Sequence, residues 1–180
     1  MFTRGMILKG FERLSELLAA GGITGELSLL GGTAMVLEFR ARQTTKDVDA
    51  IFAPVREMRK AAVQVAEELG LPPDWINDAA KGFASARGEF RAGRLPQYPN
   101  LRVLAPTPEY LLAMKVLAAR AAGVEGRGDR EDIGFLMDLL DLRTTESVMA
   151  VVHAYYAAGQ IPPRSAYLVD EIVEERDRSK

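Results

Sequence analysis

The chain has 180 residues, of which 48% are hydrophobic and 27% charged, as in an ordinary globular domain. Its 23 basic residues are balanced by 25 acidic ones, which excludes the strong overall basic charge of many nucleic-acid-binding domains. It has no cysteine, so disulfides and thiolate-bound metals are excluded. No leader segment is visible and no apolar run is long enough to span a bilayer, so we expect a cytoplasmic protein without a membrane partner.

The apolar spacing and the positions of Gly and Pro predict an N-terminal half that mixes helices and strands. The segment 74–100 is rich in Gly, Pro and Arg, which predicts a loop with one short helix near Trp75. The regular elements expected in this half are helices over 3–20, 33–39 and 54–69, and strands over 27–30, 48–52 and 101–104.

After Pro106 the apolar spacing is helical throughout. We therefore predict an α+β fold, with a mixed sheet and flanking helices over residues 1–106 and a helical C-terminal part over residues 107–180. The helices expected in the second part cover 108–122, 129–142, 144–157 and 163–176.

Asp47 and Asp49 flank a valine at the start of a predicted strand. Side chains alternate between the faces of a strand, so both carboxylates would share one face while Val48, Ala50 and Phe52 turn toward the core. Two carboxylates this close repel one another unless a cation or a proton lies between them. Mg²⁺ suits such a place because it takes oxygen ligands. A metal site and an ordinary solvated strand end are the two interpretations.

Gly31 and Gly32 lie where an apolar strand is expected to turn into a helix, and Thr33 follows them. Backbone N–H groups at such a turn can bind phosphate because no Cβ obstructs the approach, and the threonine hydroxyl adds a donor. The alternative is a tight turn in which the glycines only relieve steric strain.

Lys115 lies on a predicted helix that has almost no other charge. Asp129 and Asp132, three residues apart, share one face of the next predicted helix. A partly buried acid without a partner is costly, so we expect Lys115 to pair with Asp132. On the residues alone, this pair could be a structural contact between two helices.

Basic residues are unevenly distributed along the chain. The segment 81–102 has five basic residues and one acid, and the segment 40–60 has six basic residues and three acids. These segments are either solvated loops or one face that binds a polyanion.

The order Gly-Gly-Thr, a short helix, then Thr-Lys-Asp-Val-Asp resembles the nucleotidyltransferase superfamily of the polymerase-β type. It looks most like the branch of abortive-infection (AbiEii-like) toxin nucleotidyltransferases. That branch also has a helix-borne lysine followed by D-x-x-D at the start of the next helix, so the resemblance covers about residues 27–140. One departure is that the strand "LRVLA" lacks the third catalytic carboxylate of many superfamily members.

The resemblance implies a nucleotidyltransferase-like sheet whose cleft is closed by the helical C-terminal part. It implies an enzyme that moves a nucleoside monophosphate from a nucleoside triphosphate to an acceptor, with Mg²⁺ or Mn²⁺ as cofactor. Asp47 and Asp49 would bind the metal, and Lys115 and Asp132 would complete the catalytic set. The nucleotide-binding residues would be Gly31, Gly32, Thr33, Lys46 and Asp129.

The same resemblance implies an RNA acceptor, such as the 3′ end of a tRNA, and a toxin that is controlled by a cognate antitoxin protein. Alternatives are the same chemistry on a small molecule or a protein hydroxyl, and a non-catalytic antitoxin-like or regulatory binding module. A purely structural interaction domain is the remaining alternative, and it leaves the intact D-x-D without a purpose.

Overall fold

The computed structural model describes residues 1–119 and 124–178. Backbone packing divides the chain into two compact units. The sheet unit consists of Met1–Gly82 and Phe90–Pro106, and the helical unit consists of Phe83–Glu89 and Thr107–Lys180.

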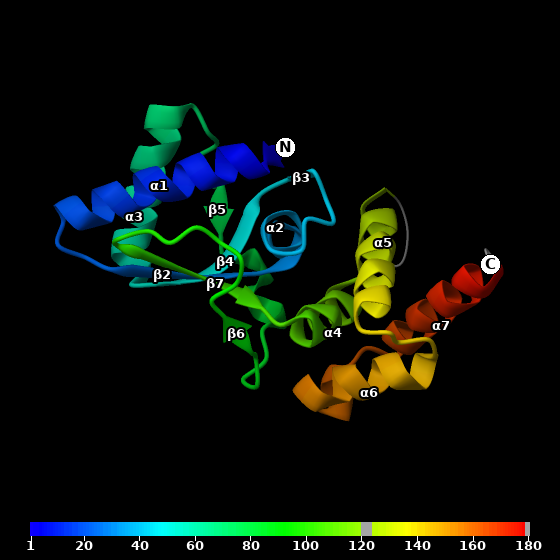
Figure 1. Cartoon of the computed structure of the whole chain (residues 1–180). Coiled ribbons are helices and arrows are strands. Elements are labelled where there is room, and N and C mark those ends of the chain that lie inside the picture. Colours follow the sequence, from blue (N-terminus) through cyan, green and yellow to red (C-terminus); the bar gives the residue numbers. More distant parts are fainter. Residues whose placement is uncertain (120–123, 179–180) are drawn as a thin grey trace. The chain divides into compact units, whose positions relative to one another are not determined.

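A five-stranded mixed sheet forms the centre of the sheet unit, with the strand order β5-β4-β2-β7-β6 (Figure 1). Strand β2 runs antiparallel to β4 and parallel to β7, while β5 is parallel to β4 and β6 is antiparallel to β7. Two further short strands, β1 and β3, pair with one another. The strands are β1 (Phe2–Thr3), β2 (Gly25–Leu29), β3 (Thr44–Thr45), β4 (Val48–Ala53), β5 (Ile76–Asn77), β6 (Phe90–Arg91) and β7 (Leu101–Pro106).

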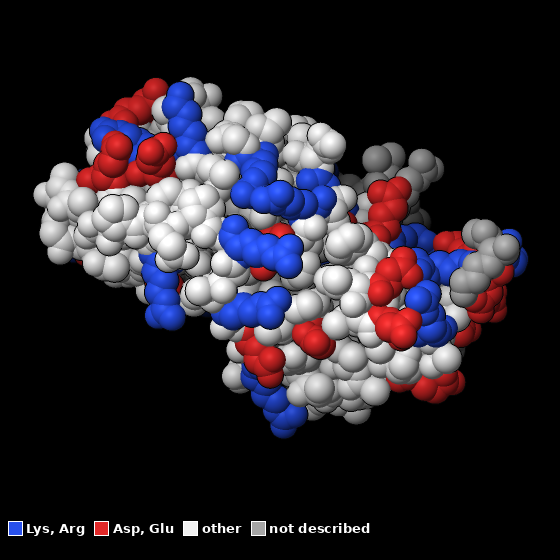
Figure 2. Space-filling view, viewed as in Figure 1, with Lys and Arg blue, Asp and Glu red and all other residues white. Residues whose placement is uncertain are grey.

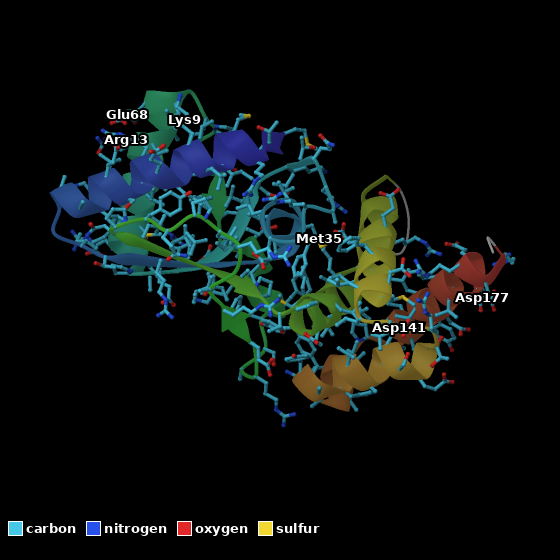
Figure 3. The ribbon with its side chains drawn as sticks, in the orientation of Figure 1. Lys9, Arg13, Met35, Glu68, Asp141 and Asp177 are labelled. Atoms are coloured by element: carbon cyan, nitrogen blue, oxygen red, sulfur yellow. The ribbon has the colours of Figure 1, made fainter. Side chains whose placement is uncertain are left out.

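The sheet unit also contains the helices α1 (Arg4–Ala20), α2 (Gly31–Leu37) and α3 (Val55–Leu69). Helix α1 begins where the Thr3 side chain accepts a hydrogen bond from the Met6 backbone, and α3 ends at Gly70 in the left-handed conformation. Helices α1 and α3 are also linked by Arg13 and Glu68, which point toward one another in Figure 3. The mixed sheet and its helices confirm the predicted α+β class.

Strand β4 alternates as its sequence predicts. Val48, Ala50 and Phe52 are buried, whereas Asp49 and Ile51 are only half-buried. Its apolar face therefore belongs to the core, and its acidic start stays accessible from the other face.

Trp75 is an anchor of the core, with 1% of its surface exposed. Its indole Nε1 donates to the Ala62 carbonyl at 3.0 Å, and its ring centroid lies 6.3 Å from that of Phe11. The short helix predicted near Trp75 is a 3₁₀ helix that begins a few residues after it. The Trp75 carbonyl accepts from Val48 N–H at 2.8 Å and so leads into β5, and a 3₁₀ helix follows only at Ala79–Phe83.

The helical unit is built from α4 (Pro108–Ala118), α5 (Val124–Leu139), α6 (Thr145–Tyr155) and α7 (Pro163–Arg178). Thr107 caps α4, and Thr144 caps α6 through a reciprocal capping box with Ser147. The end of the helix predicted over 108–122 lies outside the described residues. Within the part of the chain that the structure describes, no helix is long and apolar enough to cross a membrane.

Candidate functional site

Thr33 fastens α2 to the beginning of β4. Its hydroxyl donates to the Asp47 carbonyl at 3.1 Å and accepts from the Asp49 backbone N–H at 3.0 Å. The side chain is fully buried, with no exposed surface. Since a hydroxyl has only one hydrogen to donate, the predicted phosphate contact of Thr33 gives way to a structural role. Thr33 fixes the backbone that carries both aspartates.

Gly31 lies directly under the carboxylate of Asp49. A Cβ atom at Gly31 would be 2.9 Å from Asp49 Oδ2, and the residue has a φ of 50°. The position therefore favours glycine twice, once for its backbone conformation and once for the close approach of the carboxylate. The Leu30 N–H, just before this turn, donates to the Asp49 carbonyl at 2.9 Å.

Gly32 makes a second close approach, because a Cβ there would lie 2.6 Å from Thr45 Oγ1. The glycine pair and the segment that carries the aspartates are therefore packed directly together. Lys46, between Thr45 and Asp47, is exposed. The residues of the N-terminal half that the resemblance assigns to the metal and the phosphates thus lie next to one another in the sheet unit.

Asn77 joins this cluster from the neighbouring strand. The parallel register of β4 and β5 places Asn77 beside Asp49, and its Nδ2 donates to Asp47 Oδ2 at 3.2 Å. Asn77 could not be recognised from the sequence because β5 is too short to show an alternating pattern. The only available signal was the change from the apolar pair Trp75-Ile76 to the polar pair that follows it.

The donor set of the cluster fits a hard divalent cation. Asp47 and Asp49 are half-buried carboxylates, and such oxygen ligands suit Mg²⁺ or Mn²⁺. Among the described residues there is no group of three or more acidic, histidine or cysteine side chains that could hold a metal. Asp47 and Asp49 would be the two protein ligands, and a bound Mg²⁺ would take its remaining ligands from water or phosphate oxygens.

The third carboxylate is missing from β7, as the sequence indicates. Its only charged side chain, Arg102, is exposed and contacts Glu26 at 3.3 Å. Glu38, a buried acid of the sheet unit, accepts from the Arg94 backbone N–H at 2.8 Å and so anchors the loop before β7.

A second polar cluster lies within the helical unit. Lys115 is buried, with 8% of its surface exposed, and its Nζ lies 2.7 Å from Asp132 Oδ2 and 3.1 Å from Asp129 Oδ1. The predicted pairing of Lys115 with Asp132 is confirmed. Asp129 binds the same ammonium, which agrees with the shared helical face of the two aspartates. Its assignment to the nucleotide, and the catalytic assignment of Lys115 and Asp132, stay predictions.

Basic side chains gather on one face of the sheet unit. Figure 2 shows Lys and Arg side chains concentrated over α2, β3 and β6. What we call the basic face consists of Arg40, Arg42, Lys46, Arg91 and Arg94, which lie in these elements or within three residues of them. Met35 of α2, labelled in Figure 3, is fully buried.

Comparisons of the chain with protein-family models, with curated proteins and with solved structures found no match.

Proposed function

We propose that the chain is a metal-dependent nucleotidyltransferase, which moves a nucleoside monophosphate from a nucleoside triphosphate to an acceptor. The observation that carries this proposal is the direct packing of the glycine turn against the paired acids. The Asp49 carboxylate lies over the position where Gly31 lacks a Cβ, and the Thr33 hydroxyl bridges the backbone of Asp47 and Asp49. A glycine turn that only reverses the chain has no need for a half-buried carboxylate against it.

In this proposal, Asp47 and Asp49 hold Mg²⁺ or Mn²⁺ through their carboxylate oxygens. When bound, the metal neutralises charge on the triphosphate, which is the main requirement of phosphoryl and nucleotidyl transfer. The phosphates are assigned to the backbone N–H groups of Gly31 and Gly32, while the space where each glycine lacks a Cβ is taken up by Asp49 and Thr45. The exposed Lys46 provides positive charge next to Asp47.

Lys115, Asp129 and Asp132 keep the roles that the resemblance gives them. Within the helical unit, the two aspartates hold the ammonium in a fixed position. These roles rest on the order of the motifs along the chain.

The basic face favours a polyanionic acceptor. Its five Lys and Arg residues are exposed or half-buried. Of the nearby acids, Asp47 follows Lys46 directly, and the buried Glu38 accepts a hydrogen bond from the Arg94 backbone N–H. We therefore infer an RNA acceptor, such as a tRNA end, with toxin activity under the control of a cognate antitoxin. Steep loss of RNA affinity with salt is the expected signature. Transfer to a small molecule or a protein, and a non-catalytic regulatory module, are the competing proposals.

Metal-dependent nucleotide binding tests the site. A fluorescent nucleoside triphosphate is titrated with the full chain, with and without Mn²⁺, for the wild type, Asp49→Ala and the control Asp74→Ala. Asp74 is exposed, so its loss should leave affinity unchanged. Asp49→Ala should weaken metal-dependent binding by more than about tenfold, or about 1.4 kcal/mol. Equal affinities for the two variants would contradict the proposal.

A further inference from the structure

Asn77 is the polar side chain of β5 that faces the paired acids, and nothing in the sequence motifs assigns it. We propose that Asn77 is a positioning residue, which orients the Asp47 carboxylate for a divalent cation. This inference rests on the proposed function and names a component of its metal site. It also gives β5 a purpose beyond extending the sheet.

The orientation of the Asn77 amide is fixed from both ends. Its Oδ1 accepts from the Ala79 backbone N–H at 2.9 Å, and its Nδ2 donates to Asp47 Oδ2 at 3.2 Å. An N–H can bond only to the amide oxygen, and a carboxylate can accept only from the amide nitrogen. The two contacts therefore require the same orientation of the amide, with the NH₂ group directed at Asp47.

Asp47 depends on such support because it lies in the bend before β4, outside the strand ladder. Its carbonyl is held by Thr33 and its carboxylate by Asn77, so α2 and β5 fix the two parts of the residue separately. A carboxylate has about four acceptor positions on its two oxygens. One bond from Asn77 therefore orients the group and leaves acceptor capacity for a cation.

The competing interpretation is that Asn77 only caps the turn at Ala79, as Asn side chains often do two residues before a backbone N–H. Asn77→Ser separates the two roles. A serine hydroxyl can still accept from Ala79 N–H, but the shorter side chain cannot reach Asp47. A purely local cap predicts that this variant keeps its cation affinity, because the aspartates are unchanged.

The experiment titrates Mn²⁺ alone into the full chain and measures the free ion by its electron paramagnetic resonance signal. The variants are Asn77→Ser, Asp47→Ala and Asp78→Asn. Asp78 is the matched control because it neighbours Asn77 and instead contacts Arg59 at 3.1 Å. Circular dichroism and the fluorescence of the only tryptophan, Trp75, verify that each variant is folded.

We expect Asn77→Ser to raise the Mn²⁺ dissociation constant by about tenfold or more, the usual effect of removing the hydrogen-bond partner of a metal ligand. Asp78→Asn should stay within about twofold of the wild type, and Asp47→Ala should lose binding. Unchanged affinity in Asn77→Ser, with binding lost in Asp47→Ala, would overturn the inference and leave the proposed metal site standing. If the wild type bound no Mn²⁺, or Asp47→Ala bound it normally, the site and the inference would fail together.

Discussion

At the scale of single residues, Lys115 is a buried charge that requires a charged partner. It lies among apolar side chains of α4, with Asp132 at 2.7 Å, and Asp132 is itself 2% exposed. Lys115→Met keeps much of the side-chain volume but removes the ammonium from a buried carboxylate. Breaking a buried pair in this way typically costs about 3–5 kcal/mol, so we expect a loss of that order in urea unfolding.

The matched control for Lys115 is Arg143→Met. Arg143 contacts Asp141 at 2.8 Å, but both side chains are largely exposed to solvent. An exposed ion pair is worth at most about 1 kcal/mol, so this variant should unfold close to the wild type. Equal destabilisation by the two substitutions would mean that Lys115 is not paired inside the helical unit.

Gly31 allows a second comparison at this scale. Gly31 and Gly70 both have positive φ, at 50° and 65°, but only Gly31 has a neighbour within reach of a new Cβ. Gly70→Ala should cost about 1–2 kcal/mol because alanine is strained in the left-handed region. Gly31→Ala should cost more, and should also weaken Mn²⁺ binding, because its Cβ displaces the Asp49 carboxylate.

Urea unfolding and the Mn²⁺ titration measure the two effects of the Gly31 and Gly70 variants separately. The packing of the glycine turn against Asp49 would be refuted if Gly31→Ala were no more destabilising than Gly70→Ala and bound Mn²⁺ like the wild type.

At the scale of elements, α1 is held against the core by contact with Trp75. A Cβ at Gly10 would lie 2.5 Å from the indole ring, whereas a Cβ at Gly5 of the same helix would meet nothing within 4 Å. Gly10→Ala should therefore destabilise by about 1–3 kcal/mol through overpacking. Gly5→Ala should be neutral or stabilising, because alanine favours helix. Thermal unfolding followed by Trp75 fluorescence compares them, and equal stabilities would exclude the close contact.

The longer elements could be predicted because local signals agree with their packing. Helix α3 ends at the glycine that its sequence suggests, and β4 buries alternate residues as its pattern indicates. The strands β1, β3, β5 and β6 have two residues each, which is too few for a periodic pattern. Their positions depend on pairing with distant segments, such as Ile76 with Val48.

The residues of the candidate site likewise divide into those with a local sequence signal and those positioned by distant segments. Gly31, Asp47 and Asp49 could be recognised from spacing, since the turn and the strand are close in sequence. Asn77 could not, because its contact with Asp47 spans 30 residues and depends on the order of the strands. The hydrogen bonds of the Thr33 hydroxyl to the backbone of Asp47 and Asp49 also could not be predicted from the sequence. A threonine after a glycine pair suits a phosphate contact equally well.

At the scale of the whole molecule, buried tyrosines couple stability to high pH. Burial raises the pKa of Tyr98 to about 12, and burial also raises the pKa values of Tyr110, Tyr155 and Tyr156. Tyr98 belongs to the sheet unit and the others to the helical unit. Since an unfolded tyrosine titrates near pH 10, the unfolded chain loses these protons first as the pH rises.

The sign of the effect follows from proton linkage. Above about pH 10 the unfolded state binds fewer protons than the native state, so the free energy of unfolding should fall between about pH 10 and 12. Urea unfolding at several alkaline pH values measures the fall, and tyrosinate absorbance follows the titration. A native protein whose tyrosines all ionise near pH 10 would contradict the buried positions.

The central claim, nucleotide transfer, is tested most directly by following the label. The purified chain is incubated with Mg²⁺, total RNA and each ribonucleoside triphosphate in turn, labelled at either the α- or the γ-phosphate. Asp49→Ala and Asp74→Ala are run in parallel. We predict that wild type and Asp74→Ala transfer α-label to RNA and release γ-label as pyrophosphate, and that Asp49→Ala does neither. Transfer by Asp49→Ala at the wild-type rate, or no transfer from any labelled triphosphate by the wild type, would contradict the claim.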